Sequence, residues 1–379
     1  MSAGGELALL VSGGVDSAVC VHLLKEQGLS PHLFYIKIGP ERESEWNCTS
    51  EEDVEVCQWL ARHYGLPLEV VDLHREYWEQ VVGYWVEKAR VGLTPNPDVL
   101  CNKLIKFGAF EARFGKDFAH TATGHYARTE TDSDGRTWLC TAADPVKDQT
   151  DFLCQLSYEQ LRKLQFPVGG LLKSEVRAIA RQAHLLNAER RDSQGICFLA
   201  DIDFREYARA QLGENPGPVR ELETGKRIGE HRGLWFYTIG QRKGLGLSGG
   251  PWFVVKKNVK RNILFVSHGY DPESVYQHTI HLSGFHQLTP TAPLPRPSCE
   301  GEDVTFKIRH TPEFLPGRLI GDAHGWRVES QTPVHGVAPG QFCVIYDKDH
   351  HRCLASGEIS LSTHPEERDD PRGATSHEA

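Results

Sequence analysis

The sequence has neither a long apolar run nor a close pair of cysteines. No stretch approaches the ~18 consecutive apolar residues that a membrane-spanning helix needs, so we expect a globular protein without a membrane partner. The ten cysteines are scattered and form no CxxC pair, which argues against a zinc ribbon or a compact disulfide framework. We therefore expect mostly reduced thiols and predict no residue as a metal ligand.

The start of the chain also has no room for a signal peptide. The apolar segment 7–11 follows almost directly on the first residue, which leaves no space for a charged region, an apolar region and a cleavage site. We therefore expect a cytoplasmic protein.

An overall excess of positive charge is missing as well. The net charge is -9, which argues against a protein that coats nucleic acid by bulk electrostatics. Residues 213–268 differ, because they hold ten Lys or Arg against four Glu, a local charge of +6. This segment is a candidate nucleic-acid surface, although a basic strand face is more often merely solvated.

The chain of 379 residues is longer than one hydrophobic core usually serves, so two or three domains are expected. In the first half, short apolar runs alternate with amphipathic helical patterns, which is typical of βαβ units. The expected strands are 7–11, 32–38, 68–73 and 119–122, and the expected helices are 17–27, 50–64, 77–89, 159–164, 174–184 and 203–211. We predict an α/β domain with a doubly wound parallel sheet over residues 1–212.

The pattern changes after residue 213. Short alternating runs at 252–255, 262–266, 304–309 and 342–346 are separated by turns rich in Gly, Asn and Pro, which indicates β structure. We predict a small β domain over 213–275 and a C-terminal β-barrel domain over 276–362. The tail 363–379 should be disordered, because its residues from 364 onward carry five acids, two Arg and almost nothing apolar.

The hexapeptide Ser12–Ser17, Ser-Gly-Gly-Val-Asp-Ser, lies between an expected strand and an expected helix. Glycines there let backbone N–H groups approach a phosphate, and a helix N-terminus favours anions. The loop lacks the lysine of a Walker A motif and is similar to pyrophosphate-binding loops of enzymes that cleave ATP between the α and β phosphates. A lone Gly-Gly pair would instead suggest a simple tight turn, with Asp16 near the helix start.

The segment Thr94–Lys103 predicts a proline-stiffened loop that leads into a helix beginning at Pro97. Cys101 is then expected in the first helical turn, where aligned N–H groups, Lys103 and Lys106 would favour a thiolate. Asp98 lies three residues earlier, on the same face, and is a candidate general acid or base. The alternative is a capped helix in which Cys101 is a small core residue.

A second cysteine, Cys197, follows a polar turn within the segment 192–198. Taken alone it would be a buried strand residue. Together with Cys101 it permits chemistry in which one thiol carries a persulfide and the other releases the product by forming a disulfide.

Two further segments are candidate binding regions. Gly124 and His125 begin where an expected strand ends, which is where α/β sheets bind ligands, although a histidine there is as often structural. Lys147, Asp148 and Gln149 offer contacts to phosphate or bases, or form a solvated helix start.

These motifs together resemble the tRNA-specific 2-thiouridylases of the MnmA type. The resemblance extends over roughly residues 7–360. It is carried by Ser-Gly-Gly-Val-Asp-Ser at 12, Thr-Pro-Asn-Pro-Asp at 94, Cys-Asn-Lys at 101, Ala-Thr-Gly-His-Tyr at 122, Lys-Asp-Gln at 147, Gly-Ile-Cys-Phe at 195, Thr-Ile-Gly-Gln-Arg-Lys-Gly at 238 and Pro-Gly-Gln at 339. It implies an adenine nucleotide α-hydrolase-like (PP-loop) domain followed by two β domains that bind tRNA.

The resemblance also implies a reaction. ATP, assisted by Mg²⁺, would activate the C2 oxygen of the wobble uridine (U34) as an adenylate, and sulfur would replace that oxygen. Cys197 would carry the persulfide, Cys101 would act as nucleophile and disulfide partner, and Asp98 as acid or base. A persulfide carrier protein or a cysteine desulfurase would supply the sulfur, and we expect a monomer that binds tRNA.

By the same resemblance, binding roles fall on defined positions. The expected ATP contacts are Leu10, Val11, Ser12, Gly13, Gly14, Val15, Asp16, Ser17, Ile36 and Gly124. The expected substrate contacts are Asn96, Pro97 and Asp98 at the target base and His125 at the reacting region, and Lys147, Asp148, Gln149, Arg309, His310 and Gln341 on the tRNA elsewhere.

Three alternatives remain open from the sequence alone, two in the function and one in the sulfur carrier. One is an amidotransferase or ligase with the same ATP loop, which the set Asp98, Cys101 and Cys197 argues against. Another is a tRNA-binding protein without catalysis, and the third keeps the reaction but places an iron-sulfur cluster on the cysteines.

Overall fold

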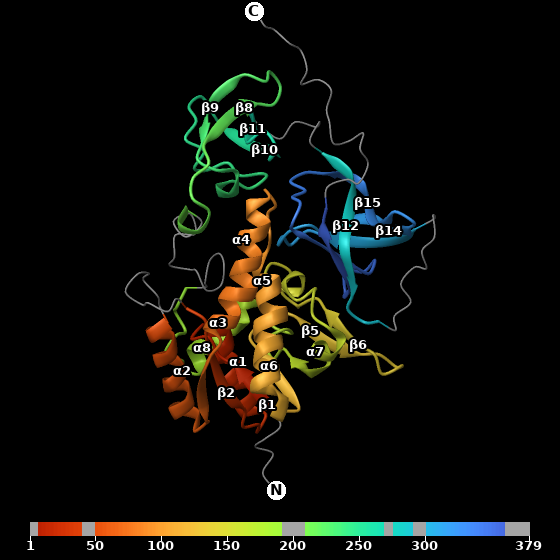
Figure 1. The fold of residues 1–379 in the computed structure, drawn as a ribbon. Helices are drawn as coiled ribbons and strands as arrows, with labels where there is room; N and C mark the ends of the chain where they lie inside the picture. Colours follow the sequence, from red (N-terminus) through yellow and green to blue (C-terminus); the bar gives the residue numbers. More distant parts are fainter. Residues whose placement is uncertain (1–6, 40–49, 192–208, 269–275, 291–300, 361–379) are drawn as a thin grey trace, which may run out of the picture.

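The computed structural model describes residues 7–39, 50–191, 209–268, 276–290 and 301–360 (Figure 1). Cys197 and its motif 192–198, most of the expected helix 203–211 and the expected disordered tail 363–379 lie outside these residues. No helix of the described part is long and apolar enough to cross a membrane.

A five-stranded parallel sheet organises the first half of the chain. Its order is β3 (Leu68–Asp72), β2 (His32–Lys37), β1 (Leu7–Leu10), β4 (His120–Thr123) and β7 (Leu164–Gln165). The central β1 reads Leu-Ala-Leu-Leu without alternation, because a parallel strand covered on both faces needs apolar side chains on both.

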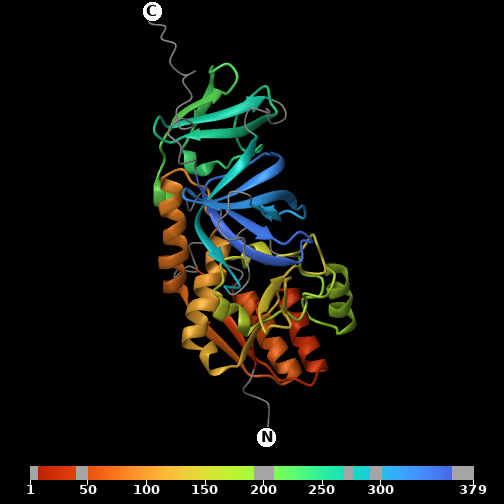
Figure 2. The same cartoon turned by 90° about the vertical axis from the view of Figure 1, so that its right-hand side faces the viewer.

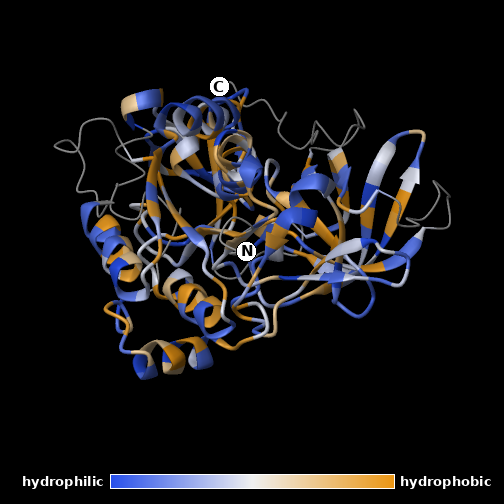
Figure 3. Cartoon of the chain, turned by 90° about the horizontal axis from the view of Figure 1, so that it is seen from below, coloured by the Kyte–Doolittle hydropathy of each residue, from blue (hydrophilic) through white to orange (hydrophobic). Residues whose placement is uncertain are grey.

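Helices cover both faces of this sheet and bury one apolar core on each. One face carries α1 (Val15–Glu26), α2 (Ser50–Tyr64) and α8 (Lys173–Gln182). The other carries α3 (His74–Tyr77), the π-helix η2 (Trp78–Val82), α4 (Gly83–Arg90), α5 (Pro97–Leu100), the π-helix η3 (Cys101–Ala109) and α6 (Phe110–Arg113). Shorter elements are η4 (Gly115–Asp117), η5 (Thr150–Phe152) and α7 (Tyr158–Lys163). The predicted doubly wound α/β fold is confirmed, and the helices alternate between hydrophobic and hydrophilic residues as amphipathic helices do (Figure 3).

The small β domain is a four-stranded sheet in the order β10 (Trp252–Asn258), β11 (Ile263–His268), β8 (Gly217–Glu221) and β9 (Arg227–His231). A short 3₁₀ helix, η6 (Leu234–Phe236), follows β9. The domain meets the end of α4 (Figure 1). There Trp85 and Ala89 pack against Trp235 and Phe236.

The C-terminal region closes into a six-stranded barrel. Its strands are β12 (Gln277–Gln287), β15 (Gly325–Val334), β14 (Leu315–Asp322), β13 (Glu302–Lys307), β16 (Phe342–Tyr346) and β17 (Arg352–Ile359), and β12 pairs back onto β17. The prediction of a C-terminal barrel is confirmed. In Figure 2 the barrel strands lie between the small β domain and the parallel-sheet domain. The predicted boundaries after residues 212, 275 and 362 stay predictions.

A hairpin that the sequence analysis did not anticipate joins the first domain to the barrel. Its strands β5 (Arg128–Thr131) and β6 (Thr137–Cys140) extend the barrel sheet, because β6 pairs with β17. The polar strand Arg-Thr-Glu-Thr gave no apolar signal, and Asp132 shapes the turn by accepting hydrogen bonds from the Asp134 and Arg136 N–H groups.

A buried ion pair connects the same two domains. Lys307 Nζ on β13 lies 3.2 Å from Asp148 Oδ2, and the two side chains are only 1% and 2% exposed. Asp148 also accepts hydrogen bonds from the Ala142 N–H and from the Thr150 hydroxyl. The Lys307 amine lies 4.1 Å from the centre of the Phe314 ring, so its charge is enclosed on several sides.

Replacing Lys307 with Met should destabilise the protein by about 3–5 kcal/mol, because it leaves the Asp148 carboxylate buried without its counter-charge. The double variant Asp148→Asn, Lys307→Met removes both charges and keeps an oxygen for the Ala142 N–H, so it should recover most of that loss. Guanidinium unfolding midpoints of the three proteins test this. A double variant no more stable than the single one would contradict it.

Candidate active site

The loop Ser12–Ser17 joins β1 to α1 in the geometry of an anion site. Gly14 is the N-cap residue of α1 and has no side chain with which to cap the helix, and a helix N-terminus of this kind favours anions. The Ser17 hydroxyl accepts a hydrogen bond from the Ser12 N–H (3.2 Å) and donates one to the Gly14 carbonyl (3.0 Å). These bonds hold the loop in a closed turn at the start of the helix.

Neighbouring side chains fix the loop from behind. Gly13 has a φ of 74°, and a β-carbon on it would lie 2.8 Å from the backbone of Asp53. Its carbonyl accepts hydrogen bonds from Asn187 Nδ2 (2.7 Å) and Arg190 Nη1 (3.3 Å). Arg190 in turn pairs with Asp53 at 2.5 Å. Only glycine satisfies both the conformation and the close approach at position 13.

The structure adds two partners of Asp16 that the sequence analysis missed. Lys173, the first residue of α8, places Nζ 2.7 and 2.9 Å from the two carboxylate oxygens, and the Tyr126 hydroxyl donates to Oδ1 at 2.8 Å. Tyr126 belonged to a motif that we had singled out, but Lys173 lies 157 residues from Asp16 with no local signal. Together they hold the acidic side chain at the mouth of the phosphate loop.

Gly124 and His125 connect this loop to the cysteine-bearing helix. A β-carbon on Gly124 would lie 2.9 Å from the Ser17 backbone nitrogen, so this glycine permits the close contact. His125 Nδ1 lies 3.0 Å from the Thr123 hydroxyl, and its ring centre lies 6.1 Å from that of Phe107. Burial and then the charge of Lys106 hold the pKa of His125 well below its usual value, so the imidazole is neutral at pH 7.

The predicted helix start at Pro97 is confirmed. Asn96 is its N-cap, and its side-chain oxygen accepts from the Asp98 N–H at 3.1 Å. The expectation that Cys101 lies in the first turn is wrong by one residue, because that turn ends with α5 at Leu100. Cys101 is 2% exposed and begins the π-helix η3, a helix type that is frequent at functional sites.

One glutamine stabilises the irregular helix after Cys101. Gln160 Nε2 donates to the carbonyls of Lys103 (2.8 Å) and Phe107 (2.6 Å), and Gly108 leaves room for the Lys103 carbonyl, which a β-carbon would approach to 2.8 Å. The wider turn of a π-helix disturbs the usual pattern of backbone hydrogen bonds, so these side-chain bonds support the segment that presents Cys101.

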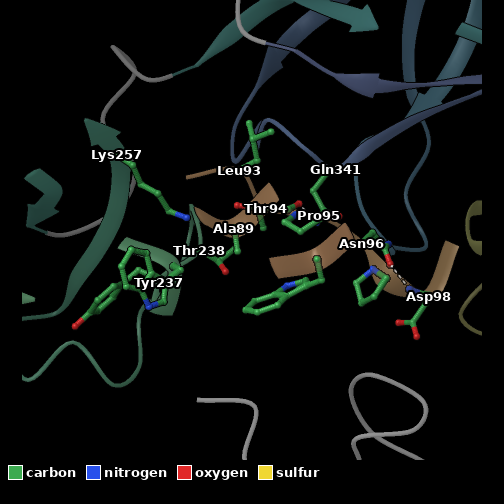
Figure 4. Close-up of a pocket in the computed structure, with 13 residues that line it drawn as sticks. Ala89, Leu93, Thr94, Pro95, Asn96, Asp98, Tyr237, Thr238, Lys257 and Gln341 are labelled. Carbon is green, nitrogen blue, oxygen red and sulfur yellow. Dashed lines mark hydrogen bonds between the residues drawn. The ribbon is translucent and has the colours of Figure 1, made fainter. Parts of the chain in front are cut away.

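Two residues of the barrel domain form hydrogen bonds with the loop before α5. Gln341 Nε2 donates to the Thr94 carbonyl at 2.7 Å, and the Thr94 N–H donates to the Pro339 carbonyl at 2.8 Å. The site residues Asn96, Pro97 and Asp98 therefore lie in one pocket with Gln341, as Figure 4 shows. The pocket has a volume of about 300 Å³ and is also lined by residues of the small β domain.

The remaining predicted tRNA contacts are placed differently. Asp148 is buried in its ion pair with Lys307, and the Gln149 side chain accepts from the Tyr126 N–H at 2.9 Å, so both side chains bond within the protein. Lys147 is half-buried. Arg309 Nη2 lies 3.2 Å from His335 Nδ1, and His310 Nδ1 lies 3.1 Å from Asp151.

Among the described residues, three side chains away from this site have ligand-like spacing. Glu130, Cys140 and His351 place their ligand atoms within 4.8 Å of one another. His351 Nε2 already bonds Glu130 at 2.8 Å, and Arg128 and Arg352 lower the pKa of that carboxyl further. The carboxylate is thus already compensated by positive charge, which disfavours a cation there.

Comparison with known protein families assigns each of the three domains of the fold. Residues 6–201 match the model described as "tRNA methyl transferase HUP domain", 205–268 the "tRNA methyl transferase PRC-barrel domain" and 278–359 the "Aminomethyltransferase beta-barrel domain". These define a nucleotide-binding parallel-sheet domain followed by two β-barrel modules.

Curated relatives give the family. The chain is 59% identical over 93% of its length to the tRNA-specific 2-thiouridylase MnmA 2 of Bacteroides fragilis, covering 99% of that protein. It is 58% identical over 93% and 94% of its length to the MnmA proteins of Parabacteroides distasonis and Porphyromonas gingivalis, covering 98% and 99% of them. The chain belongs to the tRNA-specific 2-thiouridylase family.

Solved structures are less similar. The U34-tRNA thiolase NcsA from Methanococcus maripaludis, with its [4Fe-4S] cluster, matches with a TM-score of 0.33 and 15% identity over 54% of this chain and 63% of that one. This likeness is too weak to carry an argument about mechanism.

Gly13→Ala should weaken ATP binding at least tenfold, because its β-carbon meets the Asp53 backbone at 2.8 Å and displaces the phosphate loop. Gly28→Ala is the matched control, since Gly28 has nearly the same φ (77°) but open space around it. It should cost only about 1 kcal/mol of stability and leave ATP affinity unchanged. Calorimetric titration with ATP distinguishes the two, and equal ATP affinity in both variants would refute the steric argument.

The His310–Asp151 contact predicts a pH response. The hydrogen bond that His310 donates to Asp151, together with the negative charge of Asp151, raises the pKa of His310 above 6.5, although burial and Lys307 oppose this. The stabilisation of the folded protein by this contact is therefore fully present below about pH 6.5. It is lost as the pH rises through the pKa that His310 has in the folded protein. NMR titration of His310 should give a midpoint above 6.5 that falls in Asp151→Asn; an unchanged midpoint would rule the contact out.

Proposed function

We propose that this protein replaces the C2 oxygen of the wobble uridine of tRNA with sulfur, using ATP and a cysteine persulfide. Family membership supports the 2-thiolation of tRNA and the use of ATP. The observation that carries the proposal is the joint presence of the loop at 12–17 and the Asn96–Cys101 segment on one domain, with Gly124 against Ser17 and His125 beside Phe107 of the cysteine-bearing helix.

In the first step, the uridine C2 oxygen attacks the α-phosphate of ATP and pyrophosphate leaves. The first turn of α1 accommodates the phosphates, and Gly124 permits close approach to that turn. Ile36, near the end of β2, packs against the core that contains Cys101 and would contact the adenosine part. Mg²⁺ would neutralise phosphate charge, but the Asp16 carboxylate at the loop mouth already pairs with Lys173, so we assign it no role as a ligand of the ion.

In the second step, the terminal sulfur of a persulfide on Cys197 attacks C2, and AMP leaves with the original oxygen. Cys101 then attacks the sulfur of Cys197, which releases 2-thiouridine and forms a Cys101–Cys197 disulfide. An external thiol must reduce this disulfide before the next turnover. Asp98, whose N–H is anchored by Asn96, would move the protons.

Several features of the proposal extend beyond the active site. The sulfur would come from a persulfide carrier protein or a cysteine desulfurase, and the enzyme would work as a cytoplasmic monomer. Lys147, Arg309 and His310 would contact tRNA outside the target base, and the basic segment 213–268 would add attraction for the phosphate backbone.

The test follows labelled sulfur through two cysteine variants. With unmodified tRNA, ATP, Mg²⁺ and a persulfide donor, Cys101→Ser should keep labelled sulfur on the protein but form no 2-thiouridine. Cys197→Ser should neither hold the label nor form product. Asp98→Asn should retain ATP and tRNA binding and lose product formation by about 10²–10⁴-fold, as for a general acid or base.

Cys140→Ala is the control, because this buried thiol lies on the hairpin strand β6, outside the proposed chemistry. It should form 2-thiouridine at the wild-type rate. Full activity of either serine variant would exclude the two-cysteine mechanism and direct attention to an iron-sulfur cluster, which absorbance and iron analysis of the purified protein would reveal.

A further inference from the structure

The pocket beside Asp98 extends well beyond the residues assigned to the target base. One wall is formed by Thr94–Asp98 and by Trp85 and Ala89 of α4. Trp235 of the small β domain packs against Trp85 and, with Tyr237, Thr238 and Lys257, forms the rest of the lining together with Gln341 of the barrel. All three domains thus meet around one cavity, as Figure 4 shows.

We propose that this pocket binds one nucleotide of the anticodon loop next to the target uridine, with its phosphate on Lys257 and its base against the aromatic residues. The proposal rests on the proposed function, because it takes tRNA as the substrate. It adds a binding site, and a phosphate-binding residue in the small β domain, to the contacts expected around Asn96–Asp98.

Lys257 is placed to receive an anion. Its side chain extends from β10 into the pocket, and Figure 4 shows the amine directed toward the segment that carries Ala89 and Thr94. Within the described part of the chain no carboxylate forms an ion pair with it, and burial alone lowers the pKa of this amine to about 8. A phosphate would supply the missing counter-charge and restore the usual preference for the ammonium form.

The rest of the lining suits a base and a sugar. Trp235 is half-buried and offers aromatic surface, while Trp85 and Tyr237 are buried beside it, and bases stack on such side chains without sequence preference. Asn96, Thr238 and Gln341 provide polar groups at the edges. The volume of about 300 Å³ is at the lower end for small-molecule sites, which fits one nucleotide and not a helical segment.

The position of the pocket decides which nucleotide it takes. Asp98 lies at one end, where the target uridine is expected, and Lys257 lies across the cavity on another domain. An enzyme that acts on a base extrudes it from its stack or binds it in a single strand, so the adjoining nucleotide is available to a neighbouring site. Holding that neighbour would fix the register of the target base without reading sequence.

The neighbouring Lys256 offers a matched control. Lys256 and Lys257 follow one another on β10 and so point to opposite faces, and Lys256 is exposed. Lys257→Met should weaken binding of an anticodon stem-loop about tenfold and reduce the slope of log K against log salt by about 0.7–1, the effect of one lost phosphate contact. Lys256→Met should leave both unchanged, and Lys257→Arg should retain most of the affinity.

A change in the RNA tests the same contact without relying on the fold of a variant. A neutral methylphosphonate placed at either phosphate flanking the target uridine removes one charge. At one of the two positions the methylphosphonate should weaken RNA binding to the wild-type protein about tenfold. It should not weaken RNA binding to the Lys257→Met variant any further, because both changes then remove the same interaction. ATP affinity should be the same in all variants.

The outcomes separate this proposal from the proposed function. Additive losses from Lys257→Met and the methylphosphonate, or equal losses from Lys256→Met and Lys257→Met, would overturn the phosphate assignment. These are binding measurements, so their interpretation does not depend on catalytic activity. If the wild-type protein formed no 2-thiouridine, the proposed function would be overturned, and the pocket assignment would still be decided by the binding data.

Discussion

The position of the short loop before Pro97 is the constraint on which the site depends. Thr94 is bonded on both its N–H and its carbonyl by the barrel residues Pro339 and Gln341, so a segment of the first domain takes its conformation from the last. Asn96 then caps α5 and fixes where the helix begins, which sets the position of Cys101. The geometry of the reactive residues is therefore a property of the assembled chain.

The phosphate loop is supported in a different way, from within its own domain. Asp53 on α2, together with Asn187 and Arg190 after α8, reaches the backbone of Gly13, while Lys173 and Tyr126 hold Asp16. Helices from one face of the sheet thus pre-organise the loop before any ligand arrives. Such preorganisation reduces the conformational cost of binding a flexible triphosphate.

Much of the fold and part of the site followed from the sequence, because they rest on local signals. The apolar runs at 7–11 and 32–38 and the helical pattern of 50–64 each encode an element within a few residues. The motif around Pro97 encodes a helix start through its own N-cap. The candidate site residues at 12–17 and 94–101 were found for the same reason.

The rest could not be predicted because it depends on residues far apart in the chain. Lys173 reaches Asp16 across 157 residues, and Lys307 reaches Asp148 across 159. Asp148 looked like an RNA contact in its motif, whereas the fold encloses it between two domains. The π-helix after Cys101 depends on Gln160, more than fifty residues later, and the polar hairpin strand β5 carries no apolar pattern.

That hairpin has a consequence for the modularity of the protein. Because β6 pairs with β17, the parallel-sheet domain contributes two strands to a sheet that otherwise belongs to the barrel. Cutting the chain after the first domain would leave an unpaired strand edge, the kind of surface on which other chains can add strands and aggregate. The two domains are therefore poorly suited to exchange by recombination one at a time. A chimaera that received only one of them would expose this strand edge and lose solubility, whatever its catalytic residues.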